Sequence, residues 1–218
     1  MTRNQSPESA RLWTRVSRAF IVSVLVLITF IAFESFAITT VLPVAMAELG
    51  ARWYSLAYAA SIVAAMVGMV IGGNWADRSG PRAPLTVGGA LFLVGLALSA
   101  LAPDVTTFIL ARIIKGIGGG IDSVIMYVLI ARRISEPQRP RMFGLLSAAW
   151  ILPSLAGPVV AGALTEFTSW RTVFLLVLAG SAVALVSLLL STRSLAPHER
   201  TEKRIVGRTG ALSVVAAL

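Results

Sequence analysis

YSLAYAASIVAAMVGMVIGGNW, residues 54–75, contains no charged side chain. A helix that crosses the hydrocarbon core of a bilayer needs about 20 predominantly apolar residues, and this run is long enough. Its apolar character is continuous, whereas a strand of a membrane β-barrel alternates between apolar and polar positions. The stretch therefore predicts a transmembrane helix.

Five further runs of the same kind lie at residues 19–42, 85–102, 105–130, 142–164 and 172–190. Over the whole chain, 56% of the residues are hydrophobic and 13% are charged. A typical soluble domain has about 25% charged residues. These observations predict an all-α integral membrane protein with six transmembrane helices, and they exclude an ordinary cytosolic enzyme.

Residues that usually build catalytic and metal sites are scarce. The chain has no cysteine, and its one histidine, His198, has no second histidine with which to form a metal cluster. An integral membrane enzyme needs a polar catalytic cluster at the membrane interface, and the sparse loops offer none. We therefore expect no enzymatic activity, no bound metal and no cofactor.

The net charge of +9 is compatible with a nucleic-acid-binding surface or with a membrane protein of asymmetric charge. With the N-terminus inside, the external loops contain only Arg52 and Arg171, and fifteen of the 19 basic residues are cytoplasmic. Those fifteen are Arg3, Arg11, Arg15, Arg18, Arg78, Arg82, Arg132, Arg133, Arg139, Arg141, Arg193, Arg200, Lys203, Arg204 and Arg208. The asymmetry predicts a multi-pass protein of the cell inner (plasma) membrane with a cytoplasmic N-terminus, in contact with the lipid bilayer and not with nucleic acid.

Four ionisable residues fall inside the predicted spans: Glu34 in the first, and Arg112, Lys115 and Asp122 in the fourth. At about 100° per residue, the last three and Gly119 share one helix face. One interpretation is structural: Arg112 extends to the membrane interface and Asp122 neutralises Lys115. The other is a polar stripe along a water-filled path, with Glu34 as the protonatable group and Arg112 and Asp122 as further proton-coupling candidates.

Small residues recur every four positions in the second span, at Ala60, Ala64, Gly68, Gly72 and Ala76. Such a stripe lets the backbones of two membrane helices approach closely. It predicts either tight static packing or a flat surface on which helices slide as a transporter rocks between states.

The join between the second and third spans carries the motif by which the chain resembles the major facilitator superfamily. It reads GNWADRSGPR over residues 73–82 and is similar to the family signature G-x-L-A-D-R-x-G-R-R/K at Gly73, Asp77, Arg78, Gly80 and Arg82. The glycines favour a tight turn, Asp77 is placed to cap a helix, and the arginines are placed to hold a carboxylate or a lipid phosphate. The resemblance implies a loop that latches the two halves of a transporter on the cytoplasmic side, with Pro81 in place of the usual first arginine.

Two more motifs, one before this loop and one after it, lie in the order expected for the family. Glu34 and Pro43 are nine residues apart, as are the acidic residue and the proline of the family's drug-exporting branches. Arg112, Lys115 and Gly116 resemble the R-x-x-Q-G-x-G pattern, with Lys115 where glutamine is usual. The resemblance implies multidrug-type export and a role for Arg112 in proton coupling.

The fifth span resembles the antiporter signature G-x8-G-x3-G-P-x2-G-G. The matching positions are Gly144, Pro153, Gly157, Pro158 and Gly162, where Pro153 and Ala161 replace two glycines of the signature. Two prolines in one span also predict a bend or kink. The resemblance implies exchange of substrate against protons.

Together the motifs predict the N-terminal six-helix half of a major facilitator fold, built from inverted three-helix repeats. The expected organisation is a cytoplasmic N-terminal tail at 1–18, a six-helix bundle at 19–191, a basic cytoplasmic linker at 192–210 and the truncated start of a seventh helix at 211–218. A missing C-terminal half, or a second copy, is then the expected protein partner.

The function implied by the resemblance is proton-coupled secondary transport that exports small amphipathic or drug-like molecules by alternating access. Protons and a small-molecule substrate are the expected ligands. Two alternatives stay open: a nutrient or metabolite uniporter or symporter of the same superfamily, and a non-transporting gene remnant.

Overall fold

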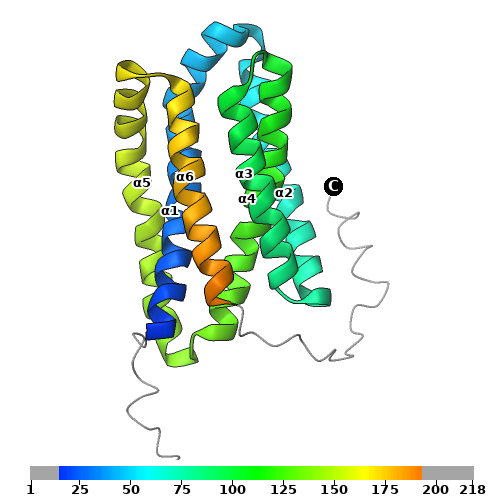
Figure 1. Cartoon of the computed structure of the whole chain (residues 1–218), viewed down its shortest axis with the longest axis vertical. Coiled ribbons are helices and arrows are strands. Elements are labelled where there is room, and N and C mark those ends of the chain that lie inside the picture. The colour runs from blue at the N-terminus through cyan, green and yellow to red at the C-terminus, as the bar shows by residue number, and fades with distance from the viewer. Residues whose placement is uncertain (1–14, 193–218) are drawn as a thin grey trace, which may run out of the picture.

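The computed structural model describes residues 15–192, so residues 1–14 of the expected N-terminal tail, residues 193–210 of the expected linker and the expected seventh-helix start lie outside that range. Every predicted span is a helix in the structure, and consecutive helices run in opposite directions (Figure 1). Each is long and apolar enough to cross a membrane. The helices are α1 (Arg15–Leu49), α2 (Tyr54–Ser79), α3 (Arg82–Leu101), α4 (Val105–Arg133), α5 (Arg139–Phe167) and α6 (Trp170–Ser191), with short 3₁₀ turns η2 (Ala51–Trp53) and η3 (Glu136–Gln138).

The first helix differs from its prediction, because α1 continues past Pro43 to Leu49. Proline lacks a backbone N–H and usually interrupts a helix. Membrane helices tolerate it, since neighbouring helices and hydroxyl side chains satisfy the backbone groups that it frees. The last turns of α1 lean across the bundle toward α2 (Figure 1). The chain also passes through Pro153 and Pro158 within one continuous helix, α5.

Contacts between the helices follow a two-fold pattern. Helix α4 packs mainly on α2 and α3, and α1 packs mainly on α5 and α6. Exchanging α1 with α4, α2 with α5 and α3 with α6 converts one set of contacts into the other. Because α1 and α4 run in opposite directions (Figure 1), the six helices form two inverted three-helix repeats, as the sequence predicts.

Small residues bring the backbones around α4 into direct contact. Gly68 and Gly72 of α2 lie against Ile117 and Ile121, where a side chain would strike the α4 backbone. A Cβ atom on Gly118 would lie 2.5 Å from the carbonyl oxygen of Gly88 in α3. The predicted packing role of the α2 stripe is confirmed at Ala64, Gly68, Gly72 and Ala76, which are buried, whereas Ala60 is only half-buried.

Several outer faces of the bundle are apolar and exposed, those of α2 and α5 among them. Helix α2 exposes Met66 and Val70, and α5 exposes Leu152, Leu155 and Val159. Such faces are available to lipid or to another helical unit.

Candidate functional site

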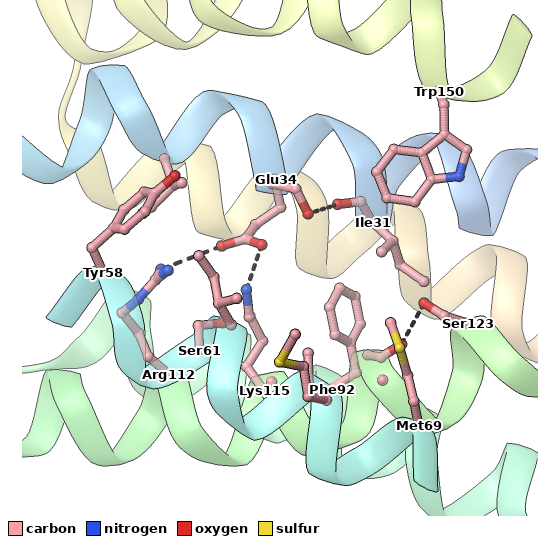
Figure 2. A pocket seen from close by; sticks show the side chains of 18 residues that line it. Ile31, Glu34, Tyr58, Ser61, Met69, Phe92, Arg112, Lys115, Ser123 and Trp150 are labelled. Atoms are coloured by element: carbon pink, nitrogen blue, oxygen red, sulfur yellow. Dashed lines mark hydrogen bonds and ion pairs between the residues drawn. The ribbon is translucent and has the colours of Figure 1, made fainter. Parts of the chain in front are cut away.

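A cavity of about 320 Å³ opens between α1, α2, α4 and α5 and carries the charged residues at its base. Figure 2 shows Glu34 projecting from α1 toward Arg112 and Lys115 of α4, with Trp150 of α5 farther along the cavity. The lining side chains are mostly apolar and include several polar groups. They belong to Ile31, Glu34, Ser35, Ile38, Tyr58, Ser61, Ile62, Ala65, Met66, Met69, Phe92, Arg112, Lys115, Gly116, Gly119, Gly120, Ser123 and Trp150.

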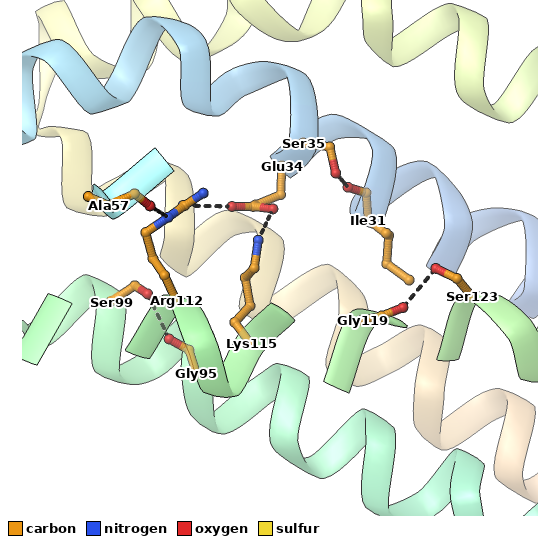
Figure 3. Close-up of polar contacts among 10 residues, drawn as sticks. All are labelled: Ile31, Glu34, Ser35, Ala57, Gly95, Ser99, Arg112, Lys115, Gly119 and Ser123. Atoms are coloured by element: carbon orange, nitrogen blue, oxygen red, sulfur yellow. Dashed lines mark hydrogen bonds and ion pairs between the residues drawn. The ribbon is translucent and has the colours of Figure 1, made fainter. Parts of the chain in front are cut away.

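Glu34 is the centre of a buried charge cluster, with 2% of its surface exposed. Its Oε2 atom accepts a hydrogen bond from the Lys115 ammonium group. Its Oε1 atom lies 3.4 Å from Nη1 of Arg112 (Figure 3). Two positive groups therefore converge on one carboxylate in a setting that excludes most water. Removing the carboxylate from such a cluster costs far more than the same change on a surface, since buried positive charge stays uncompensated.

Arg112 has a second anchor on α2, where its Nε atom donates a 2.6 Å hydrogen bond to the carbonyl oxygen of Ala57. Its guanidinium carbon also lies 6.0 Å from the ring centre of Phe108. The side chain is buried, so the interpretation in which Arg112 extends to the membrane interface is wrong. Because it contacts both α1 and α2, Arg112 holds those two helices on α4.

The local sequence of α4 explains how Lys115 reaches α1. Gly116 lies against the carbonyl oxygen of Ser61 in α2, and Gly95 of α3 lies against the backbone of Lys115. With glycine on both sides, α4 sits deep between α2 and α3. The Lys115 stem then extends along the base of the cavity to Glu34 (Figure 3).

Asp122 takes no part in this cluster. It is fully buried, and neither of its carboxylate oxygens has a hydrogen-bond partner among the described residues. It lies beside Gly88 of α3 and does not line the cavity. Lys115 and Asp122 do share the face of α4 that packs on α3, as the helical spacing predicts. The expected neutralisation of Lys115 by Asp122 is nevertheless wrong, since Lys115 pairs with Glu34.

The predicted latch residues lie at the α2–α3 connection. Gly80 adopts a positive φ of 78° and ends α2, which confirms the predicted glycine turn. Gly73 instead lies inside α2. Asp77 is also in α2 rather than at a helix start, so the capping role predicted for it is wrong; the residue before α3 is Pro81, without a side-chain cap. Asp77, Arg78 and Arg82 are exposed, as a surface latch requires.

The antiporter-signature residues of α5 are spread over two environments. A Cβ atom on Gly157 would lie 3.5 Å from the Phe36 side chain, and one on Gly162 would lie 3.6 Å from Thr40, so both positions face α1 at ordinary contact distance. Pro153 is buried and Pro158 is half-buried. Gly144 is exposed with no neighbour in reach of a Cβ atom.

Some contributors to the site gave no usable signal in the sequence. The Ala57 carbonyl, which anchors Arg112, is a backbone group, and a small residue in an apolar helix does not reveal it. Trp150 makes an edge-to-face contact with Phe36 at 6.2 Å, yet a lone tryptophan in a membrane helix is as typical of a lipid-facing position. Among residues 15–192, no three His, Cys, Asp or Glu side chains lie together as a metal site would need.

Two inverted three-helix repeats beside a cavity with buried charges are the architecture typical of a secondary transporter. Residues 24–217 match the profile of the Major Facilitator Superfamily, and the chain belongs to that family. It is 28% identical to Multidrug resistance protein 3 of Bacillus subtilis (strain 168), over 86% of this chain and 36% of that protein. It is 33% identical to the Acurin A biosynthesis cluster MFS-type transporter of Aspergillus aculeatus, over 76% of this chain and 31% of that protein.

The fold is shared with a solved structure, the crystal structure of a D-xylose-proton symporter. The TM-score is 0.71 at 17% identity, and the match covers 92% of this chain and 52% of the symporter chain. The chain thus spans about a third of the length of these curated relatives and about half of the solved structure. It corresponds to the N-terminal six-helix half of the fold.

Proposed function

We propose that this chain forms the proton-binding wall of a secondary transporter that exports small amphipathic or drug-like molecules by alternating access. The observation that carries the proposal is Glu34, a buried carboxylate at an open cavity whose two oxygens contact Arg112 and Lys115. Acidic residues inside a membrane protein that face a cavity typically belong to proton or ion pathways.

The cluster couples a proton to the arrangement of the repeats. Glu34 belongs to the first repeat, whereas Arg112 and Lys115 belong to the second. Protonation of Glu34 removes both ion pairs and so weakens the polar link between α1 and α4. A change of a few kcal/mol at such a link is enough to shift the balance between two arrangements of the repeats. Rocking of packed units around a fixed site is the way in which transporters of this design alternate access.

Export is supported by two findings that are independent of the cluster: the antiporter-like signature in α5, and the name of the Bacillus relative, a multidrug resistance protein. A second candidate is proton–substrate symport. It is favoured by the composition of the cluster, in which two cations share one carboxylate.

The orientation and the partner belong to the same proposal. The described basic residues Arg78, Arg82, Arg132 and Arg139 lie in or next to the α2–α3 and α4–α5 connections, at the end of the bundle where α1 begins. This distribution favours a cytoplasmic N-terminus in the plasma membrane. The open cavity and the apolar faces of α2 and α5 call for a second six-helix unit, either a C-terminal half or a second copy, to complete the substrate path.

The test uses everted membrane vesicles from cells that express the complete gene encoding this chain. With an acidified interior, the vesicles are expected to accumulate N-phenyl-1-naphthylamine by antiport, or to lose preloaded dye by symport, until a protonophore is added. E34Q should lower the initial rate at least ten-fold, because its side chain cannot exchange a proton. The matched control E48Q removes a carboxylate outside the cavity and should leave the rate unchanged. Transport by E34Q at the wild-type rate, with the same sensitivity to protonophore, would contradict the proposal.

A further inference from the structure

The charges that line the cavity do not balance. Glu34 of α1 is the only acidic side chain in the lining formed by the described residues, and Arg112 and Lys115 of α4 are both basic. Helix α2 adds the phenol of Tyr58, and the remaining polar groups are serine hydroxyls. Helices α3 and α5 add only the aromatic rings of Phe92 and Trp150. With Glu34 ionised the site carries one positive charge in excess, and with Glu34 protonated it carries two.

We propose that the cavity binds an amphipathic organic anion, whose negative group replaces the Glu34 carboxylate at Lys115 and Arg112 when Glu34 is protonated. The inference rests on the proposed proton coupling at Glu34. It favours the second candidate function, in which the proton and the substrate move in the same direction. It adds the substrate class and the residues that select it.

The two cations are suited to different tasks. Arg112 is fixed by the Ala57 carbonyl at 2.6 Å and touches Glu34 only at 3.4 Å. Lys115 contacts Glu34 and makes no other side-chain hydrogen bond in the described structure. Its ammonium group ends a flexible four-carbon stem, so it can turn from Glu34 to a ligand without disturbing α2. Lys115 is therefore the mobile anion-binding group, and Arg112 is the fixed one.

The rest of the cavity suits the apolar body of such a ligand. Ile31, Ile38, Met66, Met69, Phe92 and Trp150 supply aliphatic, thioether and aromatic surface around the charged base. A volume of about 320 Å³ falls at the lower end of the range for small-molecule pockets. A molecule with a fused aromatic body and one negative group fits this division between an apolar wall and a cationic base.

Charge balance then links the proton to the anion. The cluster with ionised Glu34 and the cluster with protonated Glu34 plus a bound anion carry the same net charge. Protonation alone leaves two buried cations without a counter-charge, which is costly. Proton binding therefore strengthens anion binding, and by thermodynamic reciprocity the anion strengthens proton binding by the same factor. A cationic ligand meets excess positive charge in either state.

The experiment compares two dyes with the same ring system. 1-Anilinonaphthalene-8-sulfonate carries a negative charge, and N-phenyl-1-naphthylamine carries none. Each is titrated into the full chain in phosphatidylcholine nanodiscs, and binding is measured by equilibrium dialysis with empty nanodiscs as the background. We expect the sulfonate to bind at least ten-fold more tightly than the uncharged dye, with an affinity that increases as the pH falls.

Three variants test which residues determine the affinity for the sulfonate and its pH dependence. K115Q keeps the Arg112–Glu34 pair and should reduce the preference for the sulfonate at least five-fold. E34Q should bind the sulfonate as tightly as the protonated wild type at every pH, because the competing carboxylate is gone. R52Q removes a positive charge outside the cavity and should change neither affinity nor pH dependence.

Equal binding of the two dyes, with a pH dependence that disappears in E34Q, would overturn the anion site and leave proton coupling at Glu34 intact. The same pH dependence in E34Q and wild type would contradict the proposed function itself. Nanodiscs that contain phosphatidylglycerol identify the source of the anion. Displacement of the sulfonate by this lipid assigns the site to a lipid headgroup, and unchanged binding assigns it to a free organic anion.

Discussion

Two acidic residues, Glu34 and Asp122, are buried in the bundle, but only Glu34 has partners for its carboxylate. Glu34 faces the cavity, and each of its two oxygens contacts one cation of α4. Asp122 lies in the contact between α4 and α3, where neither oxygen has a hydrogen-bond partner among the described residues. One carboxylate is held in place by its partners, whereas the other is enclosed by close backbone packing.

The difference shows that burial alone does not identify a functional charge. A buried ionisable group is costly, so a chain retains it either because partners compensate it or because it is uncharged where it lies. Glu34 meets the first condition, with partners that come from the other repeat. Asp122 is consistent with the second, so its contribution to stability and to coupling should be small.

The largest expected effect is that of E34L, which removes the carboxylate and leaves Lys115 and Arg112 without a counter-charge. Breaking a buried ion pair in this way costs about 3–5 kcal/mol. We expect a loss of this size in the free energy of unfolding, measured by SDS titration of the purified chain in mixed micelles. The double variant E34L/K115L should recover part of the loss, because it removes one of the stranded cations. A loss below about 1 kcal/mol in E34L would show that the cations are hydrated when Glu34 is absent.

The matching change on the other carboxylate, D122L, is expected to have the opposite sign. Replacing an unpaired buried polar group by an apolar group of similar shape is neutral or stabilising, here by about 0–2 kcal/mol. D122N keeps the shape and the polarity, and so serves as the control with stability close to wild type. The same SDS titration measures both variants. A loss of more than about 1 kcal/mol in D122L would show that the Asp122 carboxyl stabilises the fold and would contradict this prediction.

The sequence predicted this fold well because membrane-spanning helices have a strong local signal. Six apolar runs gave six helices, and the spacing of small residues in α2 gave its packing face. The first apolar run was shorter than the helix that it forms, because α1 continues through Pro43 to Leu49, and neighbouring helices rather than the local sequence decide whether a helix continues past a proline. The prediction failed at Asp77, which a loop motif placed at a helix start although α2 extends to Ser79.

The residues of the candidate site could be predicted from the sequence, but the ion pairs between them could not. Helical periodicity places Lys115 and Asp122 on one face of α4, and the structure agrees. Periodicity contains no information on side-chain reach, so it could not show that Lys115 extends to α1 while the shorter Asp122 remains against Gly88. The pairing of α1 with α4 depends on contacts between residues far apart in sequence, for example between Glu34 and Lys115.

The smallest effect is expected at a third acidic residue, Asp104, which is exposed and well partnered. It precedes α4 and accepts hydrogen bonds of 2.9 Å from the backbone N–H and the hydroxyl of Thr107. The Thr107 N–H, followed by its hydroxyl, lowers the pKa of Asp104 from the ordinary value of 3.8.

A carboxyl whose pKa is lower in the folded state stabilises the fold above its unfolded pKa, and that contribution disappears as the pH falls through the folded value. D104N keeps a capping side chain without the charge. The difference in melting temperature between wild type and D104N should therefore be small and constant from about pH 7 down to about pH 5, and should then shrink in acid. A difference in melting temperature that grows as the pH falls would contradict this prediction. It would mean that the protonated form of Asp104 stabilises the fold.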